Sequence, residues 1–415
     1  MSKSVVIIGA GHAGVQAAAS LREEGFNGTV TLVGDETDLP YHKPPLSKSF
    51  IKDAKAEPLM LRAEAFYSGA SIDLRLGRRI GRIDLAARRL ELSGGGHLGF
   101  DHAILATGSR PREMLLAGAP LDGVVSLRSL ADARAVRDLS AGAEDVVILG
   151  GGFIGLEIAA TLAQSGRRVT VIEAQERLLA RVVAPAISAH VEERLAALGV
   201  GIFKGMTIDR LEGENGRLRG VVTAAGTRIA AGMLIVGVGV VPNAELAAAA
   251  GLATANGVAV DGQLRSSAAE ILAIGDVASY RHWLGGTTGR LESVQNATDQ
   301  ARLAARTITG HAEDYAAVPW FWSDIGDMKL QMVGLTAGSD RQIVVGEREA
   351  NRFSVFHFRG ERLAGIESVN RPADHMLGRK MMGAGFSPGS ELVAEGGDLA
   401  AAFTAWRQAN PVEPA

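Results

Sequence analysis

The sequence predicts an α/β fold in which two parallel-sheet domains are followed by an α+β domain. With 415 residues, the chain is too long for one ordinary hydrophobic core. A pattern of strand, glycine turn, helix and strand occurs twice. From Trp320 onward, aromatic residues and alternating strand patterns replace it. Strands are expected there at Val333, 343–345 and 353–358, with a short helix near 374–381.

The repeated pattern is clearest between residues 146 and 173. Its parts are an apolar run at 146–149, then Gly150, Gly152 and Gly155 in G-x-G-x-x-G spacing, a helix that ends near residue 166, and an apolar run at 169–172. The first glycine permits a tight turn, the second lets the backbone approach a pyrophosphate, and the third lets helix and strand pack closely. Glu173 comes next, where its carboxylate can accept hydrogen bonds from a ribose 2′-hydroxyl. A turn needed only for packing is the alternative, but the surrounding pattern favours a dinucleotide site.

The same pattern opens the chain. Its parts are an apolar run at 5–8, then Gly9, Gly11 and Gly14 in the same spacing, a helical stretch to Arg22, and an apolar run at 30–33 that leads to Asp35. Helix N-termini of this kind attract anions. Two such Rossmann-like patterns indicate two bound dinucleotides.

A proline-containing segment at 39–48 follows Asp35. Pro44 and Pro45 predict a stiff, non-helical loop, and Lys43 and Lys48 flank them. A lysine on a rigid loop next to a nucleotide-binding pattern suits contact with a phosphate or an electron-rich ring. Both lysines are therefore predicted cofactor contacts, with an ordinary surface charge as the alternative.

The remaining strands and helices frame these patterns. Expected elements are a small hairpin of strands 72–74 and 88–92, a strand at 102–106 that ends at Thr107 and Gly108, a helix at 185–198, a β-rich portion at 201–229, one strand at 233–241, a buried strand at 270–277 and a helix at 292–306. Arg110 and Pro111 mark the first domain boundary. Asp276 lies at the carboxyl end of its strand, where ligands bind in parallel sheets, and its alternative role is an N-cap for the next helix.

Composition excludes several classes of chemistry. The chain has no cysteine, so a redox disulfide and thiolate ligation of an iron–sulfur cluster are excluded. Its nine histidines show no zinc-protease spacing and no serine lies in a G-x-S-x-G motif, so neither a metal site nor a hydrolase is expected. The net charge of -3 gives no reason to expect nucleic acid or an anionic membrane as a partner. Because no leader or spanning segment is recognisable, a cytoplasmic protein is expected.

Seven markers occur in order along the chain: VVIIGAGHAG, PYHKPPLSK, ILATGSRPR, GGGFIGLE, LAIGDVA, ESVQNATDQA and PWFWSD. Together they resemble the FAD-containing ferredoxin reductases of bacterial oxygenase systems, of the putidaredoxin reductase and biphenyl dioxygenase reductase type. The resemblance covers nearly the whole chain and implies a glutathione-reductase-like architecture without the redox disulfide. It implies a discontinuous FAD-binding domain at 1–112 and 243–319, an NAD-binding domain at 113–242, and a C-terminal domain at 320–415.

The resemblance also assigns residues to the two cofactors, FAD and NAD. Positions implied to contact FAD are Ala13, Asp35, Lys48, Ile80, Arg128, Asp276 and Val294, with Thr107 and Gly108 nearby. Positions implied to contact the nicotinamide nucleotide are Phe153, Ile154, Glu157, Glu173 and Gly239. The comparison places Glu157 toward the nicotinamide amide and Lys48 on the flavin side. In the first turn of its helix, Glu157 has a second reading, as a charge that complements the helix dipole.

The implied function is that of an NADH-dependent ferredoxin reductase. A hydride is expected to pass from NADH to FAD, and two electrons then leave singly to a two-iron two-sulfur ferredoxin. This ferredoxin binds transiently and serves a monooxygenase or ring dioxygenase, and the reductase is expected to be a monomer or weak dimer. Alternatives are a reductase for rubredoxin or a small molecule, a redox sensor, and an NADH oxidase, although the cysteine usual in such oxidases is absent.

Two further expectations concern specificity and electron exit. Glu173 predicts a preference for NADH because it would repel a 2′-phosphate, unless Arg167, Arg168 or Arg177 neutralises it. Without a thiol relay, electrons must leave near the flavin edge. The candidates to line this surface are a turn predicted at 320–324, which carries Trp322, and the helix that carries Arg302 and Arg306. Trp322 could also be an ordinary core aromatic. After PWFWSD the chain has Ile325 and Gly326, where family members commonly have glutamine and tyrosine.

Overall fold

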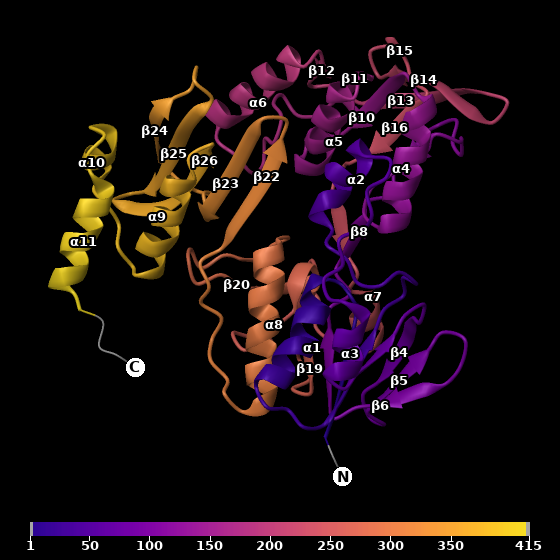
Figure 1. The fold of residues 1–415 in the computed structure, drawn as a ribbon, viewed down its shortest axis with the longest axis vertical. Coiled ribbons are helices and arrows are strands. Elements are labelled where there is room, and N and C mark those ends of the chain that lie inside the picture. Colours follow the sequence, from indigo (N-terminus) through magenta and orange to yellow (C-terminus); the bar gives the residue numbers. More distant parts are fainter. Residues whose placement is uncertain (1–2, 412–415) are drawn as a thin grey trace. The chain divides into compact units, whose positions relative to one another are not determined.

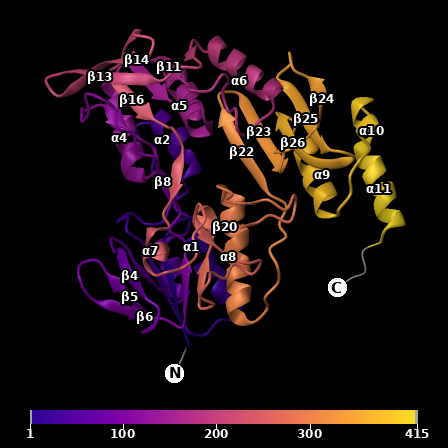
Figure 2. The ribbon, with the colours of Figure 1, turned by 180° about the vertical axis from the view of Figure 1, so that it is seen from behind.

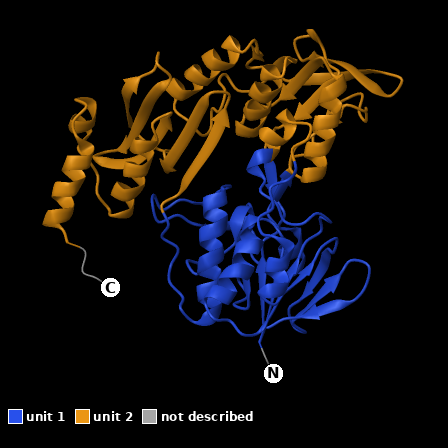
Figure 3. Ribbon diagram, in the orientation of Figure 1, with its two compact units in different colours: residues 1–45, 57–110, 240–317 blue, residues 46–56, 111–239, 318–415 orange. Residues whose placement is uncertain are grey.

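The computed structural model describes residues 3–411, and the chain divides into two compact units (Figure 3). Unit 1 comprises the chain up to Pro45, Glu57–Arg110 and Val240–Ala317. Unit 2 comprises Leu46–Ala56, Pro111–Gly239 and the chain from Val318 onward. The three-domain division made from the sequence is finer than these units and stays a prediction.

The centre of unit 1 is a five-stranded parallel sheet in the order β19-β7-β1-β2-β3. Its strands are β1 (Ser4–Ile8), β2 (Thr29–Val33), β3 (Ile72–Arg75), β7 (His102–Leu105) and β19 (Ile271–Ala273). Alternation along β1 divides the core, because Val5 and Ile7 face one side and Val6 and Ile8 face the other. Helices α1 (His12–Glu23) and α8 (Val294–Thr309) cover the first side (Figure 1).

The other side of this sheet packs against an antiparallel sheet, β4-β5-β6. Its strands are β4 (Ile80–Asp84), β5 (Arg89–Leu92) and β6 (His97–Gly99). Smaller elements complete the unit: α3 (Glu64–Gly69), α7 (Glu245–Ala249), β17 (Val240–Pro242), which pairs with β8 (Ser109–Pro111), β18 (Val258–Ala259), β20 (Ala278–Arg281), β21 (Thr288–Gly289) and the 3-10 turn η2 (Gly275–Val277).

Unit 2 begins with the same layering. Its parallel sheet has the order β12-β11-β10-β16-β9, formed by β9 (Val124–Val125), β10 (Asp145–Leu149), β11 (Arg168–Ile172), β12 (Gly201–Phe203) and β16 (Met233–Val236). Helices α4 (Leu130–Gly142), α5 (Phe153–Gln164) and α6 (Pro185–Ala197) contribute to the core on one side. The antiparallel sheet of β13 (Ile208–Glu214), β14 (Arg217–Thr223) and β15 (Arg228–Ala230) covers the other. The short helix α2 (Ser49–Lys52) adds Ile51 to the helical side.

The C-terminal part of unit 2 is a five-stranded antiparallel sheet in the order β22-β23-β26-β25-β24, with α9 on it (Figure 2). Its elements are β22 (Trp320–Ile325), β23 (Met328–Gly334), β24 (Arg341–Glu347), β25 (Arg352–Arg359), β26 (Arg362–Val369), α9 (Pro372–Gly383), α10 (Ser390–Ala394) and α11 (Leu399–Ala409). Leu330 and Phe353 join the same core as α5 and α6. The carboxylate of Glu367 also accepts a 2.9 Å hydrogen bond from the Ala184 amide, just before α6. This sheet therefore packs directly against the helices of the second parallel sheet.

Several sequence predictions are confirmed, among them both βαβ patterns, the helix that starts at Pro185 and the strands of the C-terminal sheet. The prediction of a non-helical loop at 39–48 is wrong for its second half, because the 3-10 turn η1 (Pro44–Ser47) forms there. A proline ring fixes φ near the helical value, so paired prolines suit a first helical turn. The described residues contain no helix long and apolar enough to cross a membrane.

Four further expectations need correction. The strand at 72–74 is not half of a hairpin, because β3 extends the parallel sheet while β5 pairs with β4 and β6. The strand at 233–241 is two strands, since Gly239 adopts φ +101° between β16 and β17. Residues 320–324 form strand β22 rather than a turn. Asp276 caps no helix, because strand β20 follows it.

Candidate functional site

The first glycine turn has two crowded glycines and one open one. Gly9 has φ +112°, and a Cβ added there would lie 2.2 Å from the carbonyl oxygen of Ala106. A Cβ on Gly14 would lie 1.9 Å from the carbonyl oxygen of Gly9, whereas one on Gly11 would meet nothing within 4 Å. Gly11 is also the N-cap of α1, with no side-chain cap. The protein's own packing therefore requires the outer two glycines, while the middle one leaves room for an anion at the helix N-terminus.

The second glycine turn repeats this arrangement. Gly150 also has φ +112°, and its Cβ would lie 2.4 Å from the carbonyl oxygen of Gly237. A Cβ on Gly155 would lie 2.6 Å from the Gly150 oxygen, whereas one on Gly152 would meet nothing within 4 Å. Gly152 is the N-cap of α5, again without a side-chain cap. Both turns therefore fit a dinucleotide pyrophosphate in the same way.

Glu173 is held beside the second glycine turn. Its Oε2 accepts a 2.6 Å hydrogen bond from the Gly151 amide, and its Oε1 accepts a 2.7 Å bond from the Gln175 amide. The neighbouring arginines have other partners. Arg168 pairs with Asp145 and holds the pKa of that carboxyl below its usual range, and Arg177 donates to the Ser188 hydroxyl. The carboxylate of Glu173 is therefore pre-oriented at the carboxyl end of β11.

Most of the predicted FAD residues lie in unit 1, whereas Lys48 and Arg128 lie in unit 2. Asp35 is exposed just after β2, and Lys43 pairs with Glu36 at 3.4 Å and lies over the Tyr41 ring. Ile80 is buried in the core at the start of β4. Ala13 is buried in α1, and Val294 is the first residue of α8.

Thr107 and Gly108 lie where β7 ends, and Asn243 holds both. The Thr107 hydroxyl donates to the Asn243 carbonyl, while the Asn243 side chain donates back to the Thr107 carbonyl, each at 2.8 Å. Its amide donates to the Gly108 carbonyl at 2.9 Å. These bonds fix the end of β7, next to Gly9.

Asp276 lies in η2, at the end of β19, and two side chains fix it. The hydroxyl of Ser109 donates to its Oδ2 at 3.0 Å, and the buried guanidinium of Arg290 donates to its main-chain carbonyl at 2.7 Å. Sequence reasoning missed Ser109, Arg290 and Asn243. Their contacts join positions far apart in the chain, so no local spacing could indicate them.

A buried charged cluster in unit 2 surrounds Glu157. This residue is only 3% exposed, and its Oε1 lies 2.9 Å from the Nζ of Lys48. Oε1 also accepts from the Ser323 hydroxyl at 2.6 Å and from the Asp324 amide at 3.3 Å, while Oε2 accepts from the Ser47 hydroxyl at 2.5 Å. Lys48 and Glu157, which the resemblance places on the flavin and nicotinamide sides of the reaction site, are therefore in direct contact.

The position of Glu157 differs from the prediction in one respect. It is the fifth residue of α5, so it lies beyond the first turn. Its carboxylate contacts side chains and a distant amide instead of the first amides of its own helix. The reading as a helix-dipole charge is therefore wrong.

Strand β22 presents two different faces, which explains how this cluster forms. Odd-numbered residues face α5: the Phe321 ring lies 4.8 Å from that of Phe153, Ser323 contacts Glu157, and Ile325 is buried in the shared core. Alternate residues of a strand point to the same face, so residues 321, 323 and 325 can all face α5. Ile325 therefore has a packing role. Gly326 has φ +62° in the two-residue connection to β23, where glycine is favoured.

The even-numbered face of β22 carries the predicted electron-exit residue. Trp322 is partly exposed, and its ring lies 5.6 Å from that of Trp320. The Arg379 guanidinium lies over Trp320 at 4.4 Å, and the buried His375 ring lies edge-on to it. Burial, together with the nearby Arg379 charge, lowers the pKa of His375 to about 4, so the imidazole is neutral at pH 7. Trp320 and Trp322 thus form a partly exposed aromatic row on β22. Trp322 is therefore not a fully buried core residue.

The other predicted residues are more dispersed. In unit 2, Ile154 is 49% exposed on α5, and Gly239 is exposed after β16. Arg128 precedes the Ser129–Asp132 capping box that starts α4, and its amide donates to Asp132. Arg302 and Arg306 lie on α8 in unit 1, where they pair with Asp299 and Glu313 respectively.

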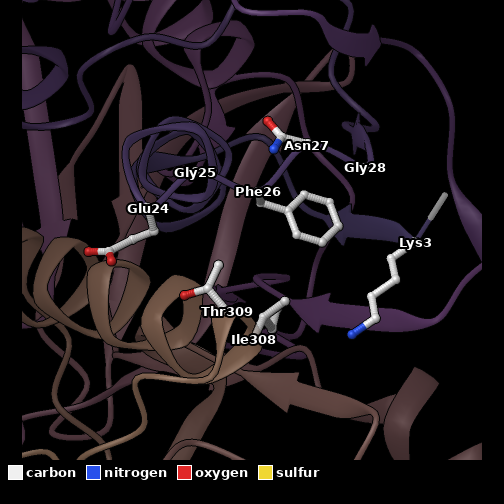
Figure 4. A pocket seen from close by; sticks show the side chains of 8 residues that line it. All are labelled: Lys3, Glu24, Gly25, Phe26, Asn27, Gly28, Ile308 and Thr309. Carbon is white, nitrogen blue, oxygen red and sulfur yellow. The ribbon is translucent and has the colours of Figure 1, made fainter.

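An open pocket of about 400 Å³ lies elsewhere in unit 1 (Figure 4). Its lining includes Glu24, Phe26 and Asn27, which follow the C-terminal end of α1, and Ile308 and Thr309 at the end of α8. The glycine turn lies at the opposite end of α1. This pocket is therefore not the predicted dinucleotide site.

Comparison with known proteins agrees with this geometry. The chain matches the family model described as pyridine nucleotide-disulphide oxidoreductase over residues 3–301 and the model described as reductase C-terminal over 320–402. Rhodocoxin reductase from Rhodococcus erythropolis is 45% identical over 91% of this chain and 89% of its own. Rubredoxin-NAD(+) reductase from Pseudomonas putida is 40% identical over 89% of this chain and 96% of its own.

A solved structure is equally similar. The ferredoxin reductase from Rhodopseudomonas palustris matches with a TM-score of 0.94 and 44% identity, covering 96% of this chain and 99% of that one. The chain is therefore an oxidoreductase that belongs to the pyridine nucleotide-disulphide oxidoreductase family, and like that family it uses FAD and NAD(H).

Proposed function

We propose that this chain is an NADH-dependent ferredoxin reductase. It takes a hydride from NADH and delivers electrons one at a time to a two-iron two-sulfur ferredoxin, which serves a monooxygenase or a ring dioxygenase. The observation that carries this proposal is the absence of cysteine from a chain whose family is named for disulphides. Without a thiol relay, the electrons must pass directly from the flavin to an external acceptor.

The two glycine turns have separate roles in this proposal. The turn at Gly9, Gly11 and Gly14 holds the FAD pyrophosphate, and the turn at Gly150, Gly152 and Gly155 holds that of NADH. FAD, when bound, supplies a two-electron acceptor that can release electrons singly. Glu173, fixed by the Gly151 amide, accepts hydrogen bonds from the adenosine ribose of NADH.

Lys48 and Glu157 provide the polar side of the reaction site. Their 2.9 Å ion pair is mostly buried, so the carboxylate holds the ammonium group in one position. We propose that Glu157 accepts a hydrogen bond from the nicotinamide amide and that Lys48 faces the flavin. Fixed groups of this kind would orient the hydride donor toward its acceptor.

Names of relatives support a small electron-transfer protein as the acceptor. The solved Rhodopseudomonas protein is a ferredoxin reductase, and the Rhodococcus relative is a rhodocoxin reductase. A second candidate acceptor is rubredoxin, because the Pseudomonas relative is a rubredoxin reductase. The Trp322 row on β22 is the proposed exit for the electrons.

Steady-state turnover with purified acceptors tests the proposal. NADH oxidation should accelerate when a two-iron two-sulfur ferredoxin is added with cytochrome c as the final acceptor, and rubredoxin should give a lower kcat/KM. A higher kcat/KM with rubredoxin would establish the second candidate. A long-lived reduced complex that turns over slowly with both proteins would instead indicate a redox sensor.

A further inference from the structure

Two buried hydroxyl groups hold the carboxylate of Glu157. Ser47 is 1% exposed and donates to Oε2 at 2.5 Å, and Ser323 is 0% exposed and donates to Oε1 at 2.6 Å. Both bonds are short, as expected for hydroxyl donors to an anionic acceptor. Each carboxylate oxygen therefore has a hydroxyl donor of its own.

These hydroxyls limit the motion of the carboxylate. A buried carboxylate is costly unless donors satisfy its oxygens, so it stays where the donors are. Lys48 and the Asp324 amide bind Oε1, the same oxygen as Ser323, whereas Ser47 binds Oε2. Rotating the carboxylate would break contacts on both oxygens at once. The orientation of Glu157 is thus set by two serines as well as by its lysine partner.

The two donors reach Glu157 from distant parts of the chain. Ser47 lies 110 positions before Glu157, and Ser323 lies 166 positions after it. The first stands at the end of η1, where the Thr161 hydroxyl, on the same helix as Glu157, donates to the Ser47 carbonyl at 3.2 Å. The second is on the face of β22 that packs against α5. The two hydroxyls therefore share one acceptor, the carboxylate of Glu157.

We infer that Ser47 and Ser323 are positioning residues for hydride transfer, acting through Glu157. They keep its carboxylate in the orientation that the nicotinamide amide and Lys48 require. This inference rests on the proposed role of Glu157. It predicts that loss of either hydroxyl slows the hydride step more than it weakens NADH binding.

The test measures anaerobic flavin reduction by NADH in stopped flow, with no ferredoxin present. Ser47→Ala and Ser323→Ala should each lower the rate at saturating NADH at least tenfold, with less than a threefold change in the dissociation constant of NADH. Ser323→Thr keeps the hydroxyl on a strand, so it should recover most of the rate. Thr161→Val is the matched control, because it removes a buried hydroxyl that contacts the Ser47 segment but not Glu157. It should stay within twofold of the wild type.

A second series asks whether the serines act through the carboxylate. In a Glu157→Ala background, adding Ser47→Ala or Ser323→Ala should change the rate less than twofold, because the shared acceptor is gone. FAD content and thermal unfolding are recorded for every variant. If Glu157→Ala loses FAD, Glu157→Leu serves as the background, because its side chain fills similar space without a hydrogen-bond acceptor. If Ser47→Ala loses FAD, the Ser323 variants decide the result alone.

Three outcomes would overturn the inference. They are a loss in Thr161→Val equal to that in Ser47→Ala, a full serine effect in the Glu157 background, and a change confined to NADH binding. Ferredoxin-dependent turnover of the wild-type protein tests the proposed acceptor separately. If ferredoxin did not support turnover while the serine variants behaved as expected, ferredoxin would be rejected as the acceptor. The positioning role of the two serines would still stand.

Discussion

The fifth residue after the N-cap glycine differs between the two dinucleotide-binding helices. It is Gln16 in α1, after Gly11, and Glu157 in α5, after Gly152. Gln16 donates to the Ser20 hydroxyl of its own helix at 3.0 Å. Glu157 instead accepts hydrogen bonds from Ser47 and Ser323, which lie in distant segments of the chain. Two nearly identical turns thus carry a local hydrogen bond in one case and a long-range charged cluster in the other.

The neighbours of each helix explain this difference. Helix α1 packs against α8, whose contacting residues include Ala301 and Ala304, so it meets an apolar surface. Helix α5 packs against β22, which places Ser323 next to Glu157. The backbone turn therefore defines a place for a pyrophosphate, while the element packed against the helix decides which polar chemistry is added.

The largest expected effect comes from the first glycine of each turn. Gly9→Ala and Gly150→Ala introduce a Cβ within 2.4 Å of a backbone oxygen at φ +112°. Each should destabilise the protein by about 2 to 5 kcal/mol, combining backbone strain with overpacking. Urea unfolding of the FAD-free protein measures this. Equal stability of these variants and the wild type would show that the turns relax more easily than their geometry indicates.

Next in size is the effect of the helix side chain itself. Glu157→Ala should slow flavin reduction by NADH about 10- to 100-fold, a rise in the barrier of roughly 1.4 to 2.7 kcal/mol. Gln16→Ala, at the equivalent position of α1, should leave that rate within twofold. Stopped-flow measurement at saturating NADH checks both. An unchanged rate in Glu157→Ala would show that the cluster around Glu157 stabilises the fold but has no role in hydride transfer.

A smaller effect is expected in coenzyme choice. Because Glu173 is fixed by the Gly151 amide, NADH should be preferred over NADPH by at least about tenfold in kcat/KM, or roughly 1.4 kcal/mol. Glu173→Ala should narrow this ratio, and Glu173→Arg should narrow it further. Asp35→Ala, the acid after the first pattern, should leave the ratio unchanged. Similar kcat/KM values for the two coenzymes in the wild type would contradict the role of Glu173.

The smallest expected effects concern electron exit. Arg302→Glu, Arg306→Glu and Trp322→Ala should each reduce ferredoxin-dependent cytochrome c reduction several-fold, and the arginine variants should weaken its salt dependence. Ferricyanide reduction by NADH should survive in all three, because a small acceptor needs no docking surface. Equal losses in both assays would indicate damage to the flavin site. No loss in either assay would place the docking surface elsewhere.

Local patterns made parts of this molecule predictable from the sequence. The βαβ units follow from apolar period, glycine spacing and the terminal acids, all within about thirty residues. The assignment of Lys48 and Glu157 to one site followed only from the resemblance, because they lie 109 positions apart in the chain. Ser47 and Ser323 had no sequence signal, since a serine in an apolar stretch is compatible with many roles.

The wrong predictions also arose from reasoning about local patterns alone. Pro44 and Pro45 restrict φ but do not exclude a helical turn. The loop prediction considered that proline breaks a helix but not that it can begin one. The stretch from Trp320 to Ile325 alternates between two faces and could have been recognised as a strand. What alternation could not reveal is that one face packs on α5, because that depends on how distant segments pack together.

We propose that the first glycine turn binds FAD and the second binds NADH, each independently of the other. Gly11 and Gly152 have φ of -83° and -85° and open space at Cβ, so Gly11→Val and Gly152→Val should fold and block only the pyrophosphate. The most direct measurement is the FAD absorbance of each purified variant, followed by anaerobic mixing with NADH. Gly11→Val should lack FAD, whereas Gly152→Val should retain it and fail to be reduced by NADH. If Gly152→Val loses FAD, or if Gly11→Val retains it, the assignment of the two turns is contradicted.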